Sequence, residues 1–307
     1  MIDILMATYN GEKYIEEQIN SILSQTYSSW KLYIRDDGST DNTVDILKKF
    51  EHQYPKKIIL VKDQHIGLGA KMNFAELLKY STSEYCMFSD QDDVWLDNKI
   101  SLCLNKMKET EKKYGKSTPI LVNTDLKVVN EDGNIINDSF WKYQQLNGEC
   151  IDINKLIVEN NVTGCTMFMN KSLVKHSLNI PNECVMHDWW IALIASAIGK
   201  RVIVNEGTIL YRQHGNNEVG AKDAKSLGFL LSKFNKNEIN KSINKSILQA
   251  EKFYQIYGDK LNQDDKIYLE KFVNIRNEKL INRKMIAINN GFYKNSLKRR
   301  LGYLLFI

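Results

Sequence analysis

The chain has 307 residues, 43% of them hydrophobic and only 3 of them proline, so we expect a sizeable folded core and exclude large-scale disorder and proline-rich or collagen-like repeats. The net charge of +5 is unevenly distributed, because residues 222–307 hold 18 Lys and Arg against 8 Asp and Glu, or +10, which leaves −5 for residues 1–221. A basic region behind an acidic body suggests an anionic partner, either a lipid surface or nucleic acid.

The N-terminal third of the chain alternates between two patterns. Short β-rich segments lie at residues 2–8, 30–36, 57–63 and 84–90. Between them, apolar residues recur at helical spacing, namely Ile15, Ile19, Ile22 and Leu23, then Val44, Leu47 and Phe50, then Phe74, Leu77 and Leu78. Strands and helices that alternate in this way predict a parallel α/β sheet, whose ligands bind at the carboxyl ends of the strands.

Beyond residue 115 the pattern is mixed, and helices alone are predicted near the C-terminus. Further strands are predicted at residues 119–129, 164–170, 201–205 and 208–214. Residues 188–199 predict a buried helix that ends at Gly199. After residue 221 the sequence is rich in Lys and Asn and predicts about three helices. We therefore expect one domain over residues 1–220 and a basic helical region over residues 221–307.

No targeting or membrane-spanning segment is predicted. The start of the sequence lacks a signal-peptide pattern, and no stretch approaches the roughly 18 uninterrupted apolar residues of a spanning helix. Five widely spaced cysteines have no C-x-x-C or zinc-ligand spacing, and we interpret them as reduced, buried thiols: Cys86, Cys103, Cys150, Cys165 and Cys184. These features indicate a cytoplasmic protein.

Polar clusters follow the predicted strands. "ATYNG" (7–11) offers a ring for stacking and an amide, although a simple turn before a helix is an alternative. "RDDGSTDNT" (35–43) places two adjacent carboxylates, Asp36 and Asp37, where they can accept hydrogen bonds from a base N–H and ribose hydroxyls. A turn with helix caps explains the rest of that segment but not the paired acids.

The segment "SDQDDVW" (89–95) places three carboxylates directly after an apolar strand. Like charges this close repel one another unless a cation, hydrogen bonds or solvent offset them. Asp90 and Asp92 form a D-x-D pair, which suits Mg²⁺ or Mn²⁺ shared with diphosphate oxygens. Asp93 either shapes the loop or supports the ligands from behind.

The string "MATYNGEKYIEEQINSILSQTYSSWKLYIRDDGSTDNT", followed by "YCMFSDQDDVW", resembles the family 2 inverting glycosyltransferases of the GT-A fold. The resemblance covers roughly residues 2–215. It implies a mixed, mostly parallel sheet flanked by helices, a nucleotide-sugar donor, a divalent metal at the D-x-D, and a single displacement with inversion at the anomeric carbon.

The resemblance also implies roles for individual residues. The nucleotide-sugar would be held by Tyr9 and Asp37 at the base, by Thr8, Asn10 and Asp36 nearby, by Asp90 at the ribose or sugar, and by Lys71 and Asn73. The metal would be held by Asp92 and by His214, a neutral imidazole that suits Mn²⁺ at least as well as Mg²⁺. The sequence departs from the family at His65, which stands in place of an Asn and puts that nucleotide contact in doubt.

A general base is implied at the start of the predicted helix 188–199. The family pattern is an E-D pair, whereas this chain has His187 and Asp188, and Asp188 aligns with the base. A helix N-cap is the structural alternative for that aspartate. Trp95, Trp189 and Trp190 are candidate acceptor-binding platforms, with a core position as the alternative for the Trp pair. Arg212 is expected to pair with a phosphate or with a surface acid.

The sub-pattern "TGCTMFMN", "HDWWIALIASAIGK" and "LYRQHGNN" is similar to bacterial rhamnosyltransferases of this family. That similarity implies dTDP-L-rhamnose as donor and a glycan or lipid-linked glycan of surface polysaccharide as acceptor. Transfer of a hexose from a UDP-sugar is the alternative. A non-catalytic scaffold subunit would predict a damaged D-x-D or a missing base, and a nucleotidyltransferase would carry a Gly- and Arg-rich phosphate loop, which this sequence lacks.

The end of the chain, "NSLKRRLGYLLFI", is basic and amphipathic. Three cations, Lys298, Arg299 and Arg300, accompany the apolar residues Leu297, Leu301, Leu304, Leu305 and Phe306. Such a segment is typical of a peripheral contact with an anionic bilayer, here at the inner face of the cell membrane. A helix packed on the body or across a homodimer is the competing interpretation. Nucleic-acid binding is not expected, because no recognised motif accompanies the charge.

Overall fold

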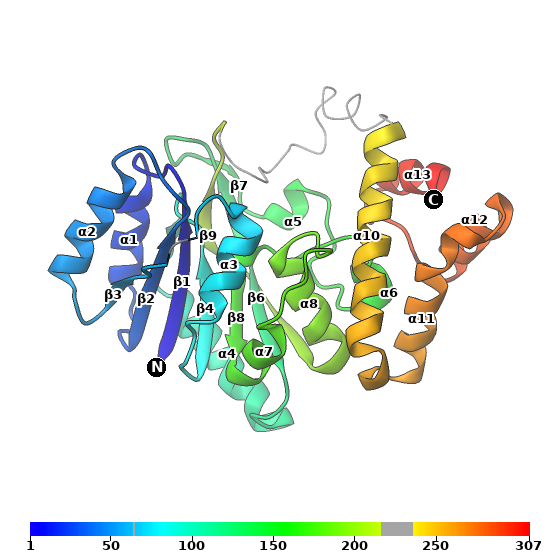
Figure 1. Ribbon diagram of the computed structural model, residues 1–307, viewed down its shortest axis with the longest axis horizontal. Helices are drawn as coiled ribbons and strands as arrows, with labels where there is room; N and C mark the ends of the chain where they lie inside the picture. Colours follow the sequence, from blue (N-terminus) through cyan, green and yellow to red (C-terminus); the bar gives the residue numbers. More distant parts are fainter. Residues whose placement is uncertain (64, 216–235) are drawn as a thin grey trace.

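The computed structural model describes residues 1–63, 65–215 and 236–307. A nine-stranded sheet runs through the body in the order β3-β2-β1-β4-β8-β6-β9-β5, and β7 pairs with β6 at one side (Figure 1). The strands are β1 (Ile2–Thr8), β2 (Trp30–Asp36), β3 (Ile58–Leu60), β4 (Tyr85–Ser89), β5 (Val94–Trp95), β6 (Ile120–Val129), β7 (Ile135–Asn137), β8 (Met167–Asn170) and β9 (Lys200–Arg212).

The sheet is mixed and mostly parallel. Strands β3, β2, β1 and β4 are parallel to one another, as are β6 and β9, whereas β8, β5 and β7 pair antiparallel with their neighbours. Helices cover both faces and form the C-terminal region: α1 (Ile15–Leu23), α2 (Thr43–Gln53), α3 (Gly69–Leu78), α4 (Lys99–Tyr114), α5 (Phe140–Tyr143), α6 (Ile153–Leu156), α7 (Lys171–Ser177), α8 (His187–Ile198), α10 (Lys236–Tyr257), α11 (Gln263–Val273), α12 (Leu280–Asn289) and α13 (Leu297–Phe306).

Alternating side chains of β1 enter two separate hydrophobic clusters, as the period of two along a strand requires. Ile2, Ile4 and Met6 pack with residues of α1, α2 and α4 on one face of the sheet. Leu5 and Ala7 pack on the other face with α3, α7 and α8, and this second cluster continues into the C-terminal helices. The body and the described C-terminal region therefore share one core.

Four predicted strands differ in detail from the observed ones. The strand expected at 57–63 is only Ile58–Leu60, and the one expected at 164–170 begins with a 3-10 turn at Gly164–Thr166. The two strands expected at 201–205 and 208–214 are a single strand, β9. Gly207 pairs with Asp125 at an irregularity in the register, and a Cβ on it would lie 2.9 Å from the Lys127 side chain, so a glycine lets the strand continue.

The C-terminal region contains four α-helices among its described residues, where about three were expected. The domain boundary expected near residue 220 lies outside the described residues.

Helix α10 packs on α8, with the Phe253 and Trp190 rings 5.3 Å apart and nearly perpendicular. In α13, Leu304 and Phe306 pack partly buried against the core, so these two residues do not belong to an exposed amphipathic face as the sequence suggested. No helix among the described residues has the length and apolar character needed to cross a membrane.

Candidate active site

The expected polar clusters meet at one edge of the sheet. In the parallel register Thr8 at the end of β1 lies beside Asp36 at the end of β2, and Met6 lies beside Ser89 at the end of β4. The segments that follow these three strands therefore emerge together (Figure 1). This edge is where sequence analysis placed the donor.

The loop after β1 is held by a residue that sequence analysis did not single out. The Gln91 side chain accepts a hydrogen bond from the Tyr9 N–H (2.8 Å) and donates one to the Tyr9 carbonyl (2.9 Å). A Cβ on Gly11 would lie 2.4 Å from Gln91 Oε1, so a larger residue there would displace the Gln91 amide from the Tyr9 backbone. Gln91 is the middle residue of the D-x-D, a position that the motif leaves open. The Tyr9 side chain remains 55% exposed at the edge of the sheet.

Asn10 lies in the left-handed region (φ 47°) and joins this loop to the loop after β2. Its N–H donates to Ser39 Oγ (2.8 Å), and its Oδ1 accepts from the Thr40 N–H (2.8 Å). Asparagine tolerates this backbone conformation better than most residues. The Asn10 side chain is therefore engaged in positioning the two loops.

The Asp36 carboxylate accepts four hydrogen bonds from its own loop and strand neighbour. The donors are Thr8 Oγ1 (3.0 Å), Ser39 Oγ (2.5 Å), and the N–H groups of Gly38 (3.0 Å) and Ser39 (2.8 Å). A carboxylate offers about four acceptor positions, so those of Asp36 are occupied. Gly38 has φ 94°, which favours glycine at this turn.

Asp37 belongs to a buried ion-pair network around Arg35, another residue that sequence analysis did not single out. Arg35 is 1% exposed and pairs with Asp37 (Nη1 to Oδ1, 3.2 Å) and with Asp63 (Nε to Oδ2, 2.7 Å). It also donates to the Asn73 amide oxygen (3.1 Å) and to the His65 carbonyl. Burial is the largest influence on the Arg35 pKa and lowers it. The hydrogen bonds and charges of Asp63 and Asp37 together outweigh burial, so the pKa is raised above its usual value.

The same network holds the loop before α3. Asp37 accepts hydrogen bonds from the N–H groups of Leu68 (3.0 Å) and Gly69 (2.8 Å). Together with the Arg35 pair this makes three bonds, which leaves one acceptor position. Asn73 is buried and faces Arg35, and Lys71 donates to the carbonyls of Asn182 and Cys184 (both 2.9 Å). Both residues expected at the donor are therefore engaged with protein groups.

The acids after β4 have a different environment. Ligand atoms of Asp90, Asp93 and Cys165 all lie within 4.8 Å of one another. Asp93 is 1% exposed, and its Oδ2 has no hydrogen-bond partner. Burial, followed by the charges of Asp92 and Asp90, raises the Asp93 pKa well above its usual range. The clustered negative charge is therefore costly to the protein on its own.

Asp92 and His214 lie together although 122 residues separate them in the chain. His214 Nε2 is 2.8 Å from Asp92 Oδ2, and the imidazole stacks on the Tyr14 ring with centroids 4.9 Å apart. Arg212, two residues earlier, pairs with Glu17 (2.5 Å) and donates to the Asp92 carbonyl (3.1 Å). Arg212 therefore pairs with a surface acid, which is one of the two partners expected for it.

These residues suit a divalent cation. The donor set comprises carboxylate oxygens and one imidazole, which Mg²⁺ and Mn²⁺ accept. The buried Asp93 Oδ2 without a partner is the feature that a positive charge nearby would stabilise. Asp90, Asp92 and Asp93 all follow β4, and the fold brings Cys165 to Asp90 and Asp93 and His214 to Asp92. Cys165 is therefore a neighbour of the expected site that sequence analysis did not include.

Asp188 lies in the first turn of α8 and is 8% exposed. The N-cap is Met186, so the alternative interpretation of Asp188 as an N-cap is wrong. The carboxylate accepts from the Asn160 amide (3.1 Å) at one oxygen and from the Gly164 N–H (3.1 Å) at the other. Burial raises the Asp188 pKa to about 7, and the hydrogen bonds oppose that rise. Such a carboxylate can exchange a proton near neutral pH.

The three tryptophans differ in exposure. Trp190 is fully buried against α10, and Trp95 is 3% exposed in the other core cluster, with Lys99 Nζ 4.7 Å from its ring centroid. The expectation that these two bind the acceptor is therefore wrong, because their faces are covered by protein. Trp189 is partly exposed and donates to the Leu156 carbonyl (2.5 Å). Of the three tryptophans, it is the one for which acceptor binding stays a prediction.

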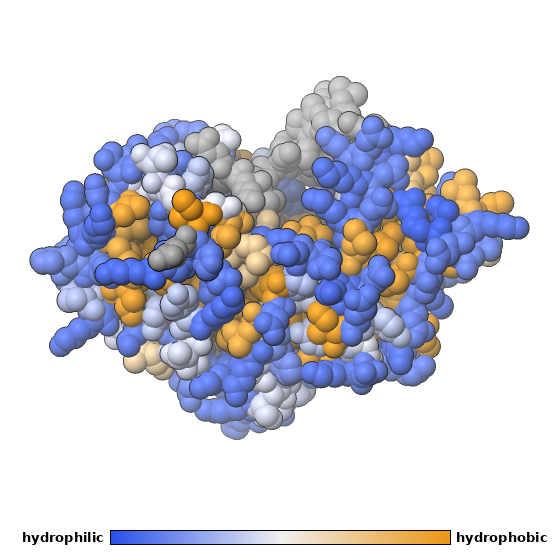
Figure 2. Space-filling view, viewed as in Figure 1, coloured by the Kyte–Doolittle hydropathy of each residue, from blue (hydrophilic) through white to orange (hydrophobic). Residues whose placement is uncertain are grey.

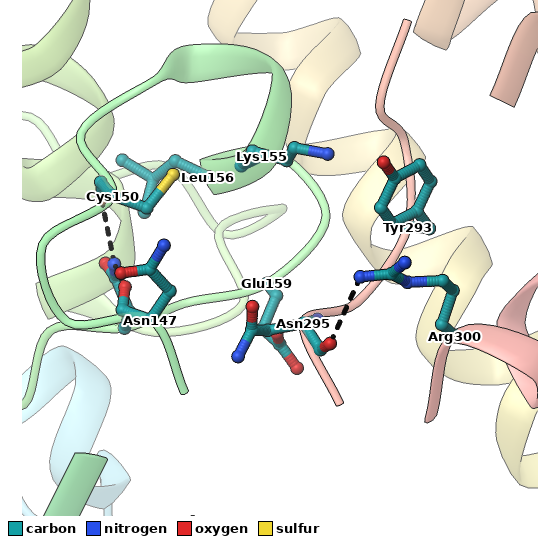
Figure 3. A pocket seen from close by; sticks show the side chains of 9 residues that line it. Asn147, Cys150, Lys155, Leu156, Glu159, Tyr293, Asn295 and Arg300 are labelled. Carbon is teal, nitrogen blue, oxygen red and sulfur yellow. Dashed lines mark hydrogen bonds between the residues drawn. The ribbon is translucent and has the colours of Figure 1, made fainter. Parts of the chain in front are cut away.

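A cavity of about 150 Å³ lies between residues 147–161 and the C-terminal region (Figure 3). Lys155 and Arg300 both point at the Tyr293 ring, with Nζ 3.7 Å and Cζ 4.4 Å from its centroid. Glu159 at the cavity wall pairs with Arg299 of α13 (3.0 Å) and precedes Asn160, which holds Asp188. The segment that contains Asn160, the hydrogen-bond donor to Asp188, is thus linked to the C-terminal region by the ion pair of Glu159 and Arg299.

The sheet, its polar edge and the acids after β4 define a class of enzyme, and a family model agrees. The model described as glycosyl transferase family 2 matches residues 3–176. The chain belongs to glycosyl transferase family 2 and is a glycosyltransferase with a GT-A fold.

Two individual relatives align with different lengths of this chain. The dTDP-rhamnosyl transferase RfbG of Shigella flexneri is 29% identical over 249 residues, which cover 78% of this chain and 83% of that protein. The UDP-Glc:alpha-D-GlcNAc-diphosphoundecaprenol beta-1,3-glucosyltransferase WfgD of Escherichia coli is 35% identical over 107 residues, which cover 35% of this chain and 41% of that protein.

Two solved structures share the fold at low identity. TarS of S. aureus in complex with UDP-GlcNAc has a TM-score of 0.55 and 16% identity, with 99% of this chain and 90% of that chain covered. The mannosyltransferase PcManGT of Pyrobaculum calidifontis, in complex with GDP-Man and Mn²⁺, has a TM-score of 0.55 and 13% identity, with 94% of this chain and 72% of that chain covered.

Proposed function

We propose that the protein transfers a sugar, with inversion, from a nucleotide-sugar donor to a glycan or lipid-linked glycan of bacterial surface polysaccharide. The observation that carries this proposal is Asp188, a buried carboxylate with a pKa of about 7 whose two oxygens are held by Asn160 and Gly164. A general base for a hydroxyl acceptor needs this combination of fixed geometry and near-neutral pKa. A scaffold subunit would not need it.

The donor site comprises residues at the edge of the sheet. The exposed Tyr9 ring is suited to stacking on the base, and the remaining acceptor position of Asp37 is suited to a base N–H. Asp90 would face the ribose or sugar. Thr8, Asn10 and Asp36 would shape this site through the hydrogen bonds they make to one another's loops, and Lys71 and Asn73 would do so from α3.

Asp92 and His214 would hold the divalent metal, Mn²⁺ or Mg²⁺, with Asp90 and Asp93 adjacent. When bound, the metal supplies Lewis-acid and electrostatic stabilisation of a departing nucleoside diphosphate. The chain's own residues do the rest of the chemistry. Asp188 accepts the proton of the acceptor hydroxyl as that oxygen attacks the anomeric carbon from the face opposite the leaving group. Asn160 and Gly164 keep both carboxylate oxygens in place during the transfer.

The donor we favour is dTDP-L-rhamnose. The similarity to RfbG extends over 78% of this chain, whereas the similarity to the UDP-Glc-dependent WfgD extends over 35% of it. A UDP-hexose is the second candidate, because WfgD is the more identical of the two where they align, at 35% against 29%. The acceptor we favour is lipid-linked, which would place the enzyme at the inner face of the cell membrane.

A thermal-shift comparison tests the donor and the metal together. The full chain is heated with dTDP-rhamnose, UDP-glucose or neither, each with Mn²⁺, Mg²⁺ or a chelator. A ligand that binds only the native state raises apparent stability by about 2.7 kcal/mol at a hundredfold excess over its Kd. We expect metal-dependent stabilisation by dTDP-rhamnose that Asp92→Ala removes. Stabilisation by UDP-glucose alone would favour the second candidate, and none by any nucleotide would support a scaffold.

A further inference from the structure

The last two helices each expose a row of aliphatic side chains. On α12 the residues Ile281, Met285 and Ile288 recur at one-face helical spacing, and on α13 the residues Leu297, Leu301 and Leu305 do the same. Each of these six side chains is between 55% and 74% exposed. We call these six residues, with Leu280 beside them, the aliphatic surface. Isolated exposed aliphatic residues are ordinary, but seven on two consecutive helices mark an interaction site.

The charge around this surface is predominantly positive. Residues 279–307 contain seven Lys and Arg and no Asp or Glu, but Lys294 is partly buried, Arg299 pairs with Glu159 and Arg300 lies over the Tyr293 ring. The cations left beside the aliphatic residues are Lys279, Arg283, Lys284 and Lys298, with one exposed acid, Glu278, next to them. Figure 2 shows hydrophobic residues among hydrophilic ones at the end of the molecule where Figure 1 places α12 and α13. Aliphatic side chains beside an excess of cations match the interfacial region of an anionic bilayer.

The opposite sides of both helices are fastened to the protein. Ala287 of α12 and Tyr303 of α13 are buried in the core cluster that also contains α8 and α10. Arg299 pairs with Glu159 of the body (3.0 Å) and donates to the carbonyls of Gln144 and Gln145. The aliphatic surface is thus presented by packed helices, so its binding would not have to order a free tail.

We propose that the aliphatic surface of α12 and α13, with its surrounding cations, docks this protein on the surface of an anionic phospholipid bilayer. A second copy of the chain fits less well, because a symmetric contact would bring two surfaces of net positive charge against each other. Sequence analysis expected a membrane contact through the last segment of the chain alone. The contact proposed here also includes α12, and it leaves out Leu304 and Phe306 because they pack against the core. It rests on the proposed function only in that a lipid-linked acceptor would lie in the same membrane.

Sedimentation with lipid vesicles tests the proposal without donor, acceptor or metal. The full chain is mixed with vesicles of equal parts phosphatidylglycerol and phosphatidylcholine, or of phosphatidylcholine alone. We expect binding to the anionic vesicles only, and weaker binding as salt is raised. The triple variant Leu297→Asn, Leu301→Asn, Leu305→Asn should bind at least tenfold more weakly. Lys279→Gln and Lys298→Gln should each weaken binding about fivefold.

The control pair Ile135→Asn and Leu248→Asn removes aliphatic residues of similar exposure from β7 and α10, and should bind as the wild type does. Circular dichroism melting checks that the triple variant is folded, which is expected because its three side chains are exposed. No binding of the wild type to anionic vesicles, or equal binding of the triple variant, would overturn the proposal. So would a wild-type dimer that the triple variant converts to a monomer while vesicle binding is unchanged. None of these outcomes depends on sugar transfer, so the proposed function is tested separately.

Discussion

Two groups of carboxylates near the same edge of the sheet have opposite environments. After β2, Asp36 has all its acceptor positions occupied and Asp37 has three, from donors that belong to the adjacent loops and Arg35. After β4 and in α8, Asp93 and Asp188 are buried with pKa values raised by burial. The first group builds the loops, whereas in the second group burial outweighs the hydrogen bonds of Asp188 and leaves Asp93 Oδ2 without a partner. Identical residue types therefore divide into scaffold and chemistry according to their donors.

The largest effect expected from this comparison is on the rate of sugar transfer. Asp188→Asn keeps the shape of the side chain but removes the base, so the transfer rate should fall about 10²- to 10⁴-fold. Thermal stability above pH 7 should rise at the same time, because the folded-state pKa is raised and the buried charge is then unfavourable. Steady-state rates and melting curves at pH 8 measure both. A variant that keeps full activity would exclude Asp188 as the base.

The second effect is on stability. Asp36→Ala leaves the donors of Gly38 and Ser39 without their acceptor and should lower the free energy of unfolding by about 2–3 kcal/mol, as measured by urea unfolding. Glu16→Ala, which removes a carboxylate from the exposed side of α1, is the matched control and should change it by less than about 0.5 kcal/mol. If Asp36→Ala were as stable as the control, the scaffold interpretation of the first group would be wrong.

A third test addresses the donor side. Tyr9→Ala removes an exposed ring whose backbone is held independently by Gln91, so stability should be unchanged. Loss of stacking should weaken nucleotide affinity about tenfold, which isothermal titration with dTDP and metal would measure. Tyr9→Phe should retain that affinity. Equal affinity of all three proteins would remove Tyr9 from the nucleotide site.

A fourth test is a pH dependence within the wild type. Since Asp188 must be deprotonated to act and burial raises its pKa to about 7, kcat/KM should fall about tenfold per pH unit below that value. The residual kcat/KM of Asp188→Asn should not fall in this way as the pH is lowered. A wild-type profile that is flat between pH 5 and 8 (about three units) would contradict a base with this pKa.

Much of the fold follows from local pattern. The strands Ile2–Thr8 and Trp30–Asp36 begin and end where alternation and the flanking polar residues predicted, and α8 ends before Gly199 as expected. The strings after β1, β2 and β4 resemble those of the family, and because the carboxyl ends of parallel strands meet at one edge, they also located the polar edge. The single strand β9 was not evident, because the polar residues between 205 and 208 resemble a turn and only its pairing with β6 shows that it continues.

By itself the sequence determined the parallel half of the sheet, the polar edge and the residue types available there, since these depend on periodicity and short spacing. Only the tertiary structure decided which of those residues are engaged by protein. Arg35 and Gln91 were not expected because their partners, Asp63 and Tyr9, lie 28 and 82 residues away. Trp95 and Trp190 proved to be core for the same reason, because burial depends on elements distant in the chain. Hydrogen bonds and burial across such separations have no local signature, so they can be read only from the folded chain.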